Sequence, residues 1–322
     1  RTGVDSSWFQ VAGALKSTLL HCCVWAEAAG AWAGLIIMIG TAVDCNRVLA
    51  GGAAVPCPSD GLLHWRLHLA YDGTDFAGWQ RQLDHVQTVQ GEVDKALSLV
   101  FATDVRTVGV SRTDSGVHAR CHVCHFSTPD NWRGTTPLEA DVALQRLRLV
   151  LPAAVLALAL GRTVPSFHAR LSAIRKKYTY RLALTGAVSP FESRYCWPVG
   201  PLDVAAMDRA ARLLSGRRHD FTALTLGEHE PSYHGGVEKT LDVHVQHDSG
   251  AGATVLLVCD RFLYKMARRV VGALVQVGRG VFPPERVLHL ERTEVPTAPP
   301  QGLFLEHVEY PCYFPAPEDA PL

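Results

Sequence analysis

The residue pattern with the clearest chemical potential is the run Arg112-Thr113-Asp114, which lies between the apolar segments 105–110 and 121–126. Both segments are typical of β-strands, so we expect the run on a connecting loop, with Gly116 relaxing the backbone beside the carboxylate. A guanidinium two residues away can hold the carboxylate ionised and oriented, as a nucleophilic or general-base aspartate requires. The alternative is a polar turn in which Asp114 caps its own backbone.

Basic residues at helical spacing form a second candidate group, in residues 261–278. Apolar residues occupy the other side, so the segment is predicted to be an amphipathic helix with a basic stripe. The stripe has no interleaved acids, and like charges at this spacing repel each other, which favours a polyanionic partner; a solvated helix face is the alternative. The stripe consists of Arg261, Lys265, Arg268 and Arg269.

A further basic cluster surrounds two tyrosines. Tyr178 and Tyr180 share one face if residues 178–184 form a strand, and an aromatic ring beside basic groups can stack on an unpaired base; burial of both rings in the core is the alternative. The cluster consists of Arg170, Arg175, Lys176, Lys177 and Arg181. Together the cluster and the stripe predict a phosphate track, for which we single out Arg170, Lys176, Lys177, Lys265 and Arg269.

Residues 109–119 read Gly-Val-Ser-Arg-Thr-Asp-Ser-Gly-Val-His-Ala and resemble the catalytic loop of TruA-type tRNA pseudouridine synthases. The usual loop in that family reads Gly-Arg-Thr-Asp-Ala-Gly-Val-His-Ala, so Ser111 and Ser115 replace a glycine and an alanine. Further blocks resemble the family in the same order, and the resemblance spans residues 62–311. These blocks are residues 71–80 with 88–91, 167–170 running into 175–180, 220–222, and 262–272 with 298–303.

The resemblance implies that the chain isomerises uridine to pseudouridine in tRNA, in the anticodon stem-loop region. Asp114 is then the catalytic residue, as nucleophile or proton acceptor, Tyr178 stacks on the base, and Arg112 and Arg268 bind near it. The base must leave its stack, because uracil is detached from C1′, rotated and reattached through C5. No metal or other cofactor is expected for this redox-neutral isomerisation. The expected partners are tRNA and a second copy of the chain in a homodimer.

Two other function classes are alternatives. A non-catalytic RNA-binding protein of the same fold is expected to lack Asp114, Arg112 or Tyr178, and all three are present. A metal-dependent hydrolase that uses Asp114 with nearby histidines would be inactivated by a chelator, whereas a synthase would not.

Two segments contain residue types that bind metals. Cys121-His122-Val123-Cys124 has no second pair to complete a structural zinc site, so we expect strand thiols there. Residues 228–230 with His234 are also rich in such side chains, but proline and glycine surround them, which is typical of a solvated loop.

The order of predicted elements indicates an α+β fold. Strand, helix, strand, strand, helix, strand, beginning with a half-buried strand over residues 63–69, is the order of a ferredoxin-like unit, and it roughly recurs after residue 170. We therefore predict two ferredoxin-like α+β subdomains that form a continuous, mainly antiparallel sheet with a central cleft. The expected domains are an extension or linker over residues 1–60, a subdomain with the Asp114 loop over residues 61–169, and a subdomain with the basic helix over residues 170–322.

Composition sets the remaining limits. The chain has 322 residues, 48% of them hydrophobic and 19% charged, as in a globular protein long enough for two domains. Its formal net charge is zero, so RNA binding has to rest on a local patch. Nine cysteines without a repeating spacing suit reduced thiols. We expect an intracellular protein, in the cytoplasm, the nucleus or an organelle if residues 1–60 are a targeting segment rather than a disordered one, and no membrane contact of the core.

Overall fold

The computed structural model describes residues 61–130, 138–226, 237–248, 251–312, 314 and 317, and Gly61–Leu322 forms one compact unit. The expectations for residues 1–60, and for residues 228–230 with His234, concern parts of the chain outside these ranges. The subdomain boundary expected at residues 169 and 170 remains a prediction within the compact unit.

The described residues form strands, α-helices and short 3-10 helices in a mixed order. None of these helices is long and apolar enough to cross a membrane. The strands are β1 (Leu62–Tyr71), β2 (Val108–Gly109), β3 (His118–Pro129), β4 (Val155–Arg162), β5 (Arg175–Ala183), β6 (Trp197–Pro198), β7 (Arg218–Asp220), β8 (Glu238–His247), β9 (Gly252–Cys259) and β10 (Leu303–Glu309). The helices are α3 (Val89–Phe101), α4 (Ala140–Val150), α5 (Val204–Leu214) and α6 (Met266–Gly278), with 3-10 turns at Thr222–Leu224, Pro284–Leu288 and Pro300–Gly302.

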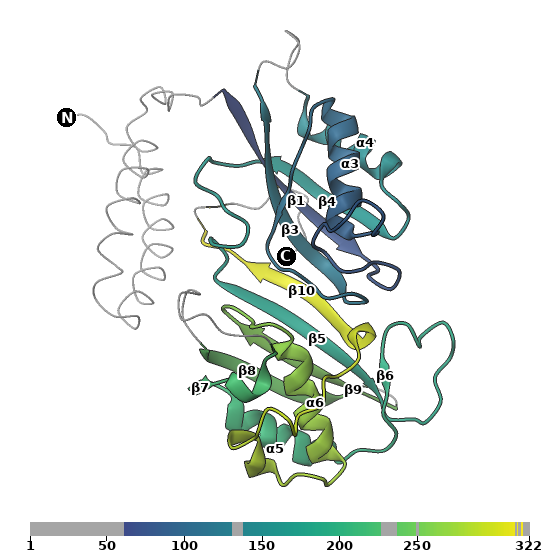
Figure 1. Cartoon of the computed structure of the whole chain (residues 1–322), viewed down its shortest axis with the longest axis vertical. Coiled ribbons are helices and arrows are strands. Elements are labelled where there is room, and N and C mark those ends of the chain that lie inside the picture. The colour runs from purple at the N-terminus through teal and green to yellow at the C-terminus, as the bar shows by residue number, and fades with distance from the viewer. Residues whose placement is uncertain are drawn as a thin grey trace, which may run out of the picture. The chain divides into compact units, whose positions relative to one another are not determined.

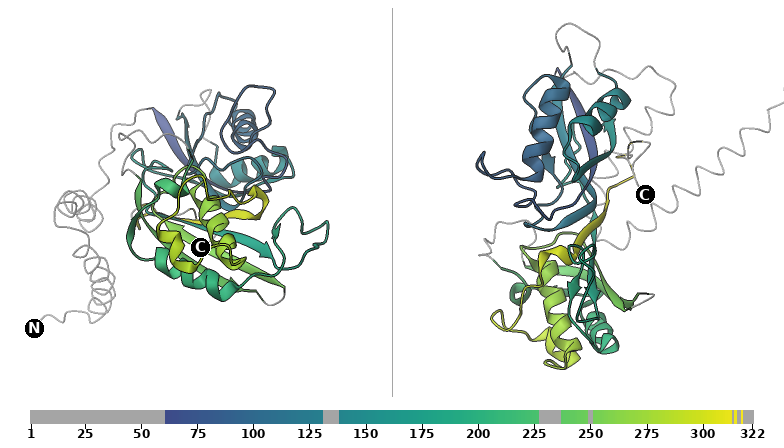
Figure 2. Two further views of the ribbon diagram at one scale, coloured as in Figure 1. Left: turned by 60° about the horizontal axis from the view of Figure 1, so that its bottom comes forward. Right: turned by 90° about the vertical axis from the view of Figure 1, so that its right-hand side faces the viewer.

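One long sheet contains strands from both halves of the chain, in the order β4-β1-β3-β10-β5-β9-β8-β7. Strand β10 lies between β3 and β5, parallel to β3 and antiparallel to β5. Figure 1 shows α3 and α4 beside one half of the sheet and α5 and α6 beside the other. The right-hand view of Figure 2 separates the two helix pairs along the long axis, with β10 between them. The predicted α+β fold with a continuous, mainly antiparallel sheet is confirmed.

Strand β1 is buried on both faces, although its alternating sequence is typical of a half-buried strand. Trp65 and Leu69 are fully buried on one face, as expected, but Arg66 on the other face is buried too. The Arg66 guanidinium carbon lies 4.4 Å from the ring centroid of Tyr310, and Arg66 Nη1 donates to the Phe314 carbonyl. Residues that follow β10 therefore cover a face that the sequence pattern marks as solvated.

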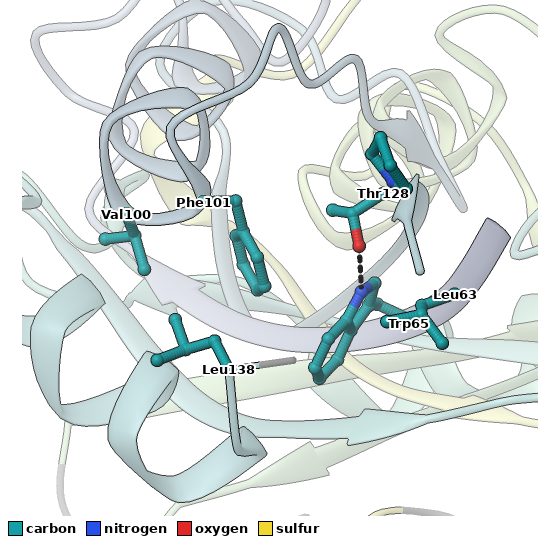
Figure 3. A pocket seen from close by; sticks show the side chains of 7 residues that line it. Leu63, Trp65, Val100, Phe101, Thr128 and Leu138 are labelled. Atoms are coloured by element: carbon teal, nitrogen blue, oxygen red, sulfur yellow. Dashed lines mark hydrogen bonds between the residues drawn. The ribbon is translucent and has the colours of Figure 1, made fainter. Parts of the chain in front are cut away.

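A small apolar pocket lies where β1 and β3 meet the end of α3 (Figure 3). The Trp65 indole N–H donates to Thr128 Oγ1 at 2.9 Å. Because this hydroxyl already has a partner and most of the other lining side chains are apolar, we assign these residues to core packing and not to a reactive site. Its lining residues are Leu63, Trp65, Val100, Phe101, Thr128, Pro129 and Leu138.

Helix α6 begins at Met266, later than the predicted start at residue 261. Lys265 precedes it with φ +57°, a left-handed conformation that an α-helix cannot continue through. Arg269 lies on α6 but is only 3% exposed, and its guanidinium donates to the carbonyls of Ala223 and Arg292. The predicted exposed stripe is therefore wrong: Arg261 and Lys265 lie outside the helix, and Arg269 holds neighbouring segments together.

Replacing Arg269 with Gln should lower the free energy of unfolding by about 1–3 kcal/mol, because the shorter amide cannot serve both main-chain carbonyls. Urea denaturation measures this change. The matched control is Arg146→Gln, the same substitution at an exposed position of α4, which should change stability by less than about 0.5 kcal/mol. Equal stability of the two variants would contradict the structural role of Arg269.

Candidate active site

The Asp114 carboxylate and the Arg268 guanidinium form an ion pair at the centre of the candidate site. Arg268 Nη1 donates to Asp114 Oδ2 at 2.7 Å, and the side chains of Arg268 and Asp114 are only 13% and 20% exposed. The ion pair therefore orients the Asp114 carboxylate at a position that solvent reaches only in part.

Main-chain contacts on the far side of Arg268 fix the position of its guanidinium. Arg268 Nε donates to the Ala298 carbonyl at 2.8 Å, and the Ala298 N–H donates to the Arg268 carbonyl. This close approach depends on Gly272, where a Cβ atom would lie 2.0 Å from the Pro296 carbonyl oxygen. The sequence thus needs glycine one turn along α6 to bring the segment 296–298 against Arg268.

The loop that carries Asp114 is fastened to the end of β1 and the turn that follows it. Thr113 is buried, and its hydroxyl lies 2.8 Å from the Tyr71 hydroxyl. The Thr113 carbonyl accepts from the Trp79 N–H at 3.0 Å. Gly78, at φ +96°, lets the turn approach, because a Cβ atom there would lie 2.8 Å from the Thr113 carbonyl oxygen. The residue before Asp114 is thus fixed by its contacts with β1 and the following turn rather than by the loop itself.

Ser111 joins the same loop to β5. Ser111 Oγ and Tyr178 Oη are 2.9 Å apart, and His122 Nε2 donates to the Ser111 carbonyl at 3.1 Å. Burial lowers the pKa of His122 to about 3, so the ring is neutral and its Nε2 carries the proton. The His122 ring stacks on Trp79 at a centroid distance of 3.7 Å, which fixes the position of the donor.

Tyr178 and Tyr180 are both buried on one face of β5, which confirms that they share a face. The Tyr178 ring meets Phe262 edge-on, with the centroids 4.9 Å apart. Burial raises the pKa of Tyr178 to about 12; the hydrogen bond with Ser111 opposes this rise and the negative charge of Asp114 adds to it. The phenol is therefore neutral near pH 7 and lies close enough to Asp114 to sense its charge.

Arg112 does not pair with Asp114, and the expectation that a guanidinium two residues away orients the carboxylate is wrong. Arg112 is exposed, and it makes no ion pair or side-chain hydrogen bond with any described residue. The orienting guanidinium belongs to Arg268, 154 residues along the chain from Asp114. Arg112 therefore presents a solvent-facing guanidinium two residues before the candidate catalytic carboxylate.

The basic residues around β5 divide between the two faces of the sheet. Lys176 is 6% exposed on the face of Tyr178, and its pKa is lowered to about 8 by burial and by the positive charges of Arg261 and Arg170. Lys177 is exposed on the opposite face, so a track along β5 cannot contain both lysines. Lys265 is half-buried just before α6.

A second connection between the two halves of the chain went unnoticed in the sequence. Asp72 accepts a hydrogen bond from the Tyr195 hydroxyl at 2.7 Å and lies 3.1 Å from His118 Nδ1, while His118 Nε2 donates to the Arg194 carbonyl at 3.1 Å. These contacts fasten the connection between β5 and β6 to the turn after β1. A tyrosine in a turn-rich segment gives little indication of such a distant partner.

The residue types that suggested metal binding serve packing instead. Cys121 and Cys124 are buried free thiols, and burial raises the pKa of Cys121 to about 11. His122 donates a hydrogen bond to the Ser111 carbonyl. Across the described ranges, no group of three or more His, Cys, Asp and Glu side chains could hold a metal ion.

Comparison with known proteins identifies a single family. A family model described as tRNA pseudouridine synthase matches residues 210–311. A tRNA pseudouridine synthase A from Maridesulfovibrio salexigens is 40% identical over 257 residues, which are 76% of this chain and 89% of that protein. The enzyme of the same name from Moorella thermoacetica is 40% identical over 253 residues, 76% of this chain and 98% of that protein.

A third relative, from a different organism, gives the same result. The tRNA pseudouridine synthase A from Frankia casuarinae is 40% identical over 263 residues, 79% of this chain and 91% of that protein. The identity extends over nearly the whole length of each relative. The chain belongs to the tRNA pseudouridine synthase A family.

Proposed function

We propose that this protein isomerises uridine to pseudouridine in tRNA, with Asp114 as the catalytic residue. The reaction breaks the bond between C1′ and N1 and forms one between C1′ and C5; C5 loses a proton and N1 gains one. The observation that carries the assignment of Asp114 is its ion pair with Arg268, next to the buried ring of Tyr178. A charged carboxylate in such a setting can act as nucleophile or general base.

Three side chains around Asp114 are assigned to the uridine in this proposal. Tyr178 provides a ring for the extruded base, and its neutral hydroxyl adds no charge near Asp114. Arg268 orients the carboxylate through their ion pair. Arg112, which has no partner among the described residues, is available to occupy the space that the base leaves or to bind a phosphate.

Two residues of the proposed phosphate track, Arg170 and Lys176, are supported by their positions relative to the Asp114 loop and Tyr178. Arg170 Nη2 approaches the Gly109 carbonyl at 3.5 Å, just before the Asp114 loop, and Lys176 shares a face of β5 with Tyr178. Arg170 and Lys176 therefore stay in the track, together with Lys265 before α6. Arg269 and Lys177 are left out, because the Arg269 guanidinium donates to two main-chain carbonyls of the fold and Lys177 lies on the opposite face of β5.

The anticodon stem-loop as target and a homodimer as working form complete the proposal. Both come from the family resemblance. Mapping pseudouridines in tRNA treated with the purified protein tests the target region, and sedimentation of the free protein tests the dimer.

Asp114→Asn should abolish release of tritium from tRNA labelled at C5 of uridine, with a fall of at least about a thousandfold, because the substitution removes the charge and keeps the size. The matched control is Asp104→Asn, the same change at an exposed carboxylate that pairs with Arg106, and it should release tritium at the wild-type rate. Turnover by Asp114→Asn close to that of the control would refute the catalytic assignment.

Binding of tRNA should weaken as the pH rises above about 8, because Lys176 loses its charge there. A bound phosphate favours the ammonium form, so the affinity is constant below the pKa of the free protein and falls above it. Filter binding between pH 7 and pH 9 measures the effect. Lys176→Arg stays charged throughout and should flatten the profile, whereas Lys177→Arg on the opposite face should keep it. Identical profiles for wild type and Lys176→Arg would exclude Lys176 from the track.

A further inference from the structure

We infer that Ser111 is a positioning residue, whose hydroxyl holds the Tyr178 hydroxyl and so fixes the ring that receives the uracil. The inference rests on the proposed function and deepens it. It concerns a position where the usual loop of the family has glycine, which has no side chain to offer. The contact that carries it is the 2.9 Å separation of Ser111 Oγ and Tyr178 Oη.

The Tyr178 hydroxyl depends on this contact. The side chain is 5% exposed, and a buried tyrosine hydroxyl is normally hydrogen-bonded, because an unpaired one costs free energy. Among the described residues, Ser111 is the one hydrogen-bonding partner of Tyr178 Oη. Since Phe262 contacts only the ring, the serine sets the direction of the C–O bond and the packing sets the ring plane.

Ser111 is itself held in place, as a positioning residue must be. Its carbonyl accepts a hydrogen bond from the N–H of His122 Nε2, and His122 is fixed by stacking on Trp79. The main chain at residue 111 therefore cannot rotate freely to follow a displaced tyrosine. Two contacts join the Asp114 loop to the other half of the chain: Asp114 with Arg268, and Ser111 with Tyr178. Together they keep Asp114 and Tyr178 at a constant separation.

A double-mutant cycle tests whether Ser111 acts through the tyrosine hydroxyl. The four proteins are wild type, Ser111→Ala, Tyr178→Phe and the double variant, compared by single-turnover tritium release and by tRNA affinity. Ser111→Ala should slow the wild-type rate about fivefold, the effect of one neutral hydrogen bond, and leave tRNA affinity unchanged. In the Tyr178→Phe background it should have no effect on the rate, because the partner hydroxyl is already absent.

Two outcomes would overturn the inference: an equal loss of rate in both backgrounds, or no loss in the wild-type background. Ser115→Ala is the matched control, since Ser115 lies in the same loop as Ser111 but donates to the Phe76 carbonyl, and it should leave the rate unchanged. If Ser111→Ala is unstable, Ser111→Gly, the residue usual in the family, replaces it in the cycle.

A measurement without turnover separates this inference from the proposed function. In protein labelled with 13C at the tyrosine Cζ, the Tyr178 resonance is assigned by its loss in Tyr178→Phe. Ser111→Ala should shift that resonance at pH 7, and Ser115→Ala should not; an unmoved resonance overturns the contact. If the wild-type protein makes no pseudouridine but Ser111→Ala still shifts the Tyr178 resonance, the proposed function alone would be refuted.

Discussion

The arrangement of this protein depends on one ion pair between residues far apart in the chain. Asp114 lies on a loop before β3 and Arg268 lies in the first turn of α6, so their contact requires both halves of the sheet to be joined correctly. Each partner has further support: Thr113 fastens the loop that carries Asp114, and the Ala298 carbonyl accepts a hydrogen bond from Arg268 Nε. Because these contacts already restrict both side chains, forming the ion pair costs little further side-chain entropy and fixes the positions of the two charges.

Part of this arrangement could be predicted from local sequence and part could not. The alternation in residues 178–184 places Tyr178 and Tyr180 on one face, because a strand has a period of two. The loop position of Asp114 follows from the apolar segments around it. The choice of Arg268 over Arg112 as its partner could not be predicted, since it is decided by packing between segments separated by 154 residues.

The errors have a common physical origin. Charge and helical spacing suggested that Arg269 is solvated, yet carbonyls from two other segments surround its guanidinium. Likewise, alternation suggested a solvated Arg66, which the aromatic residues after β10 cover. Burial of an arginine depends on what distant segments place over it, and a linear pattern contains no information on that cover. The start of α6 was misjudged because the left-handed turn at Lys265 has no mark in a sequence that contains neither glycine nor proline there.

The position of β10 also has a consequence for how the chain matures during translation. Without this strand, β4, β1 and β3 form one ribbon and β5, β9, β8 and β7 form another, with no ladder between them. Because β10 follows all the other described strands along the chain, the ladders that join the two ribbons form only after β10 has left the ribosome. Nascent chains released early would carry Asp114, Tyr178 and Arg268 in two unjoined pieces and expose the unpaired edges of β3 and β5 to aggregation.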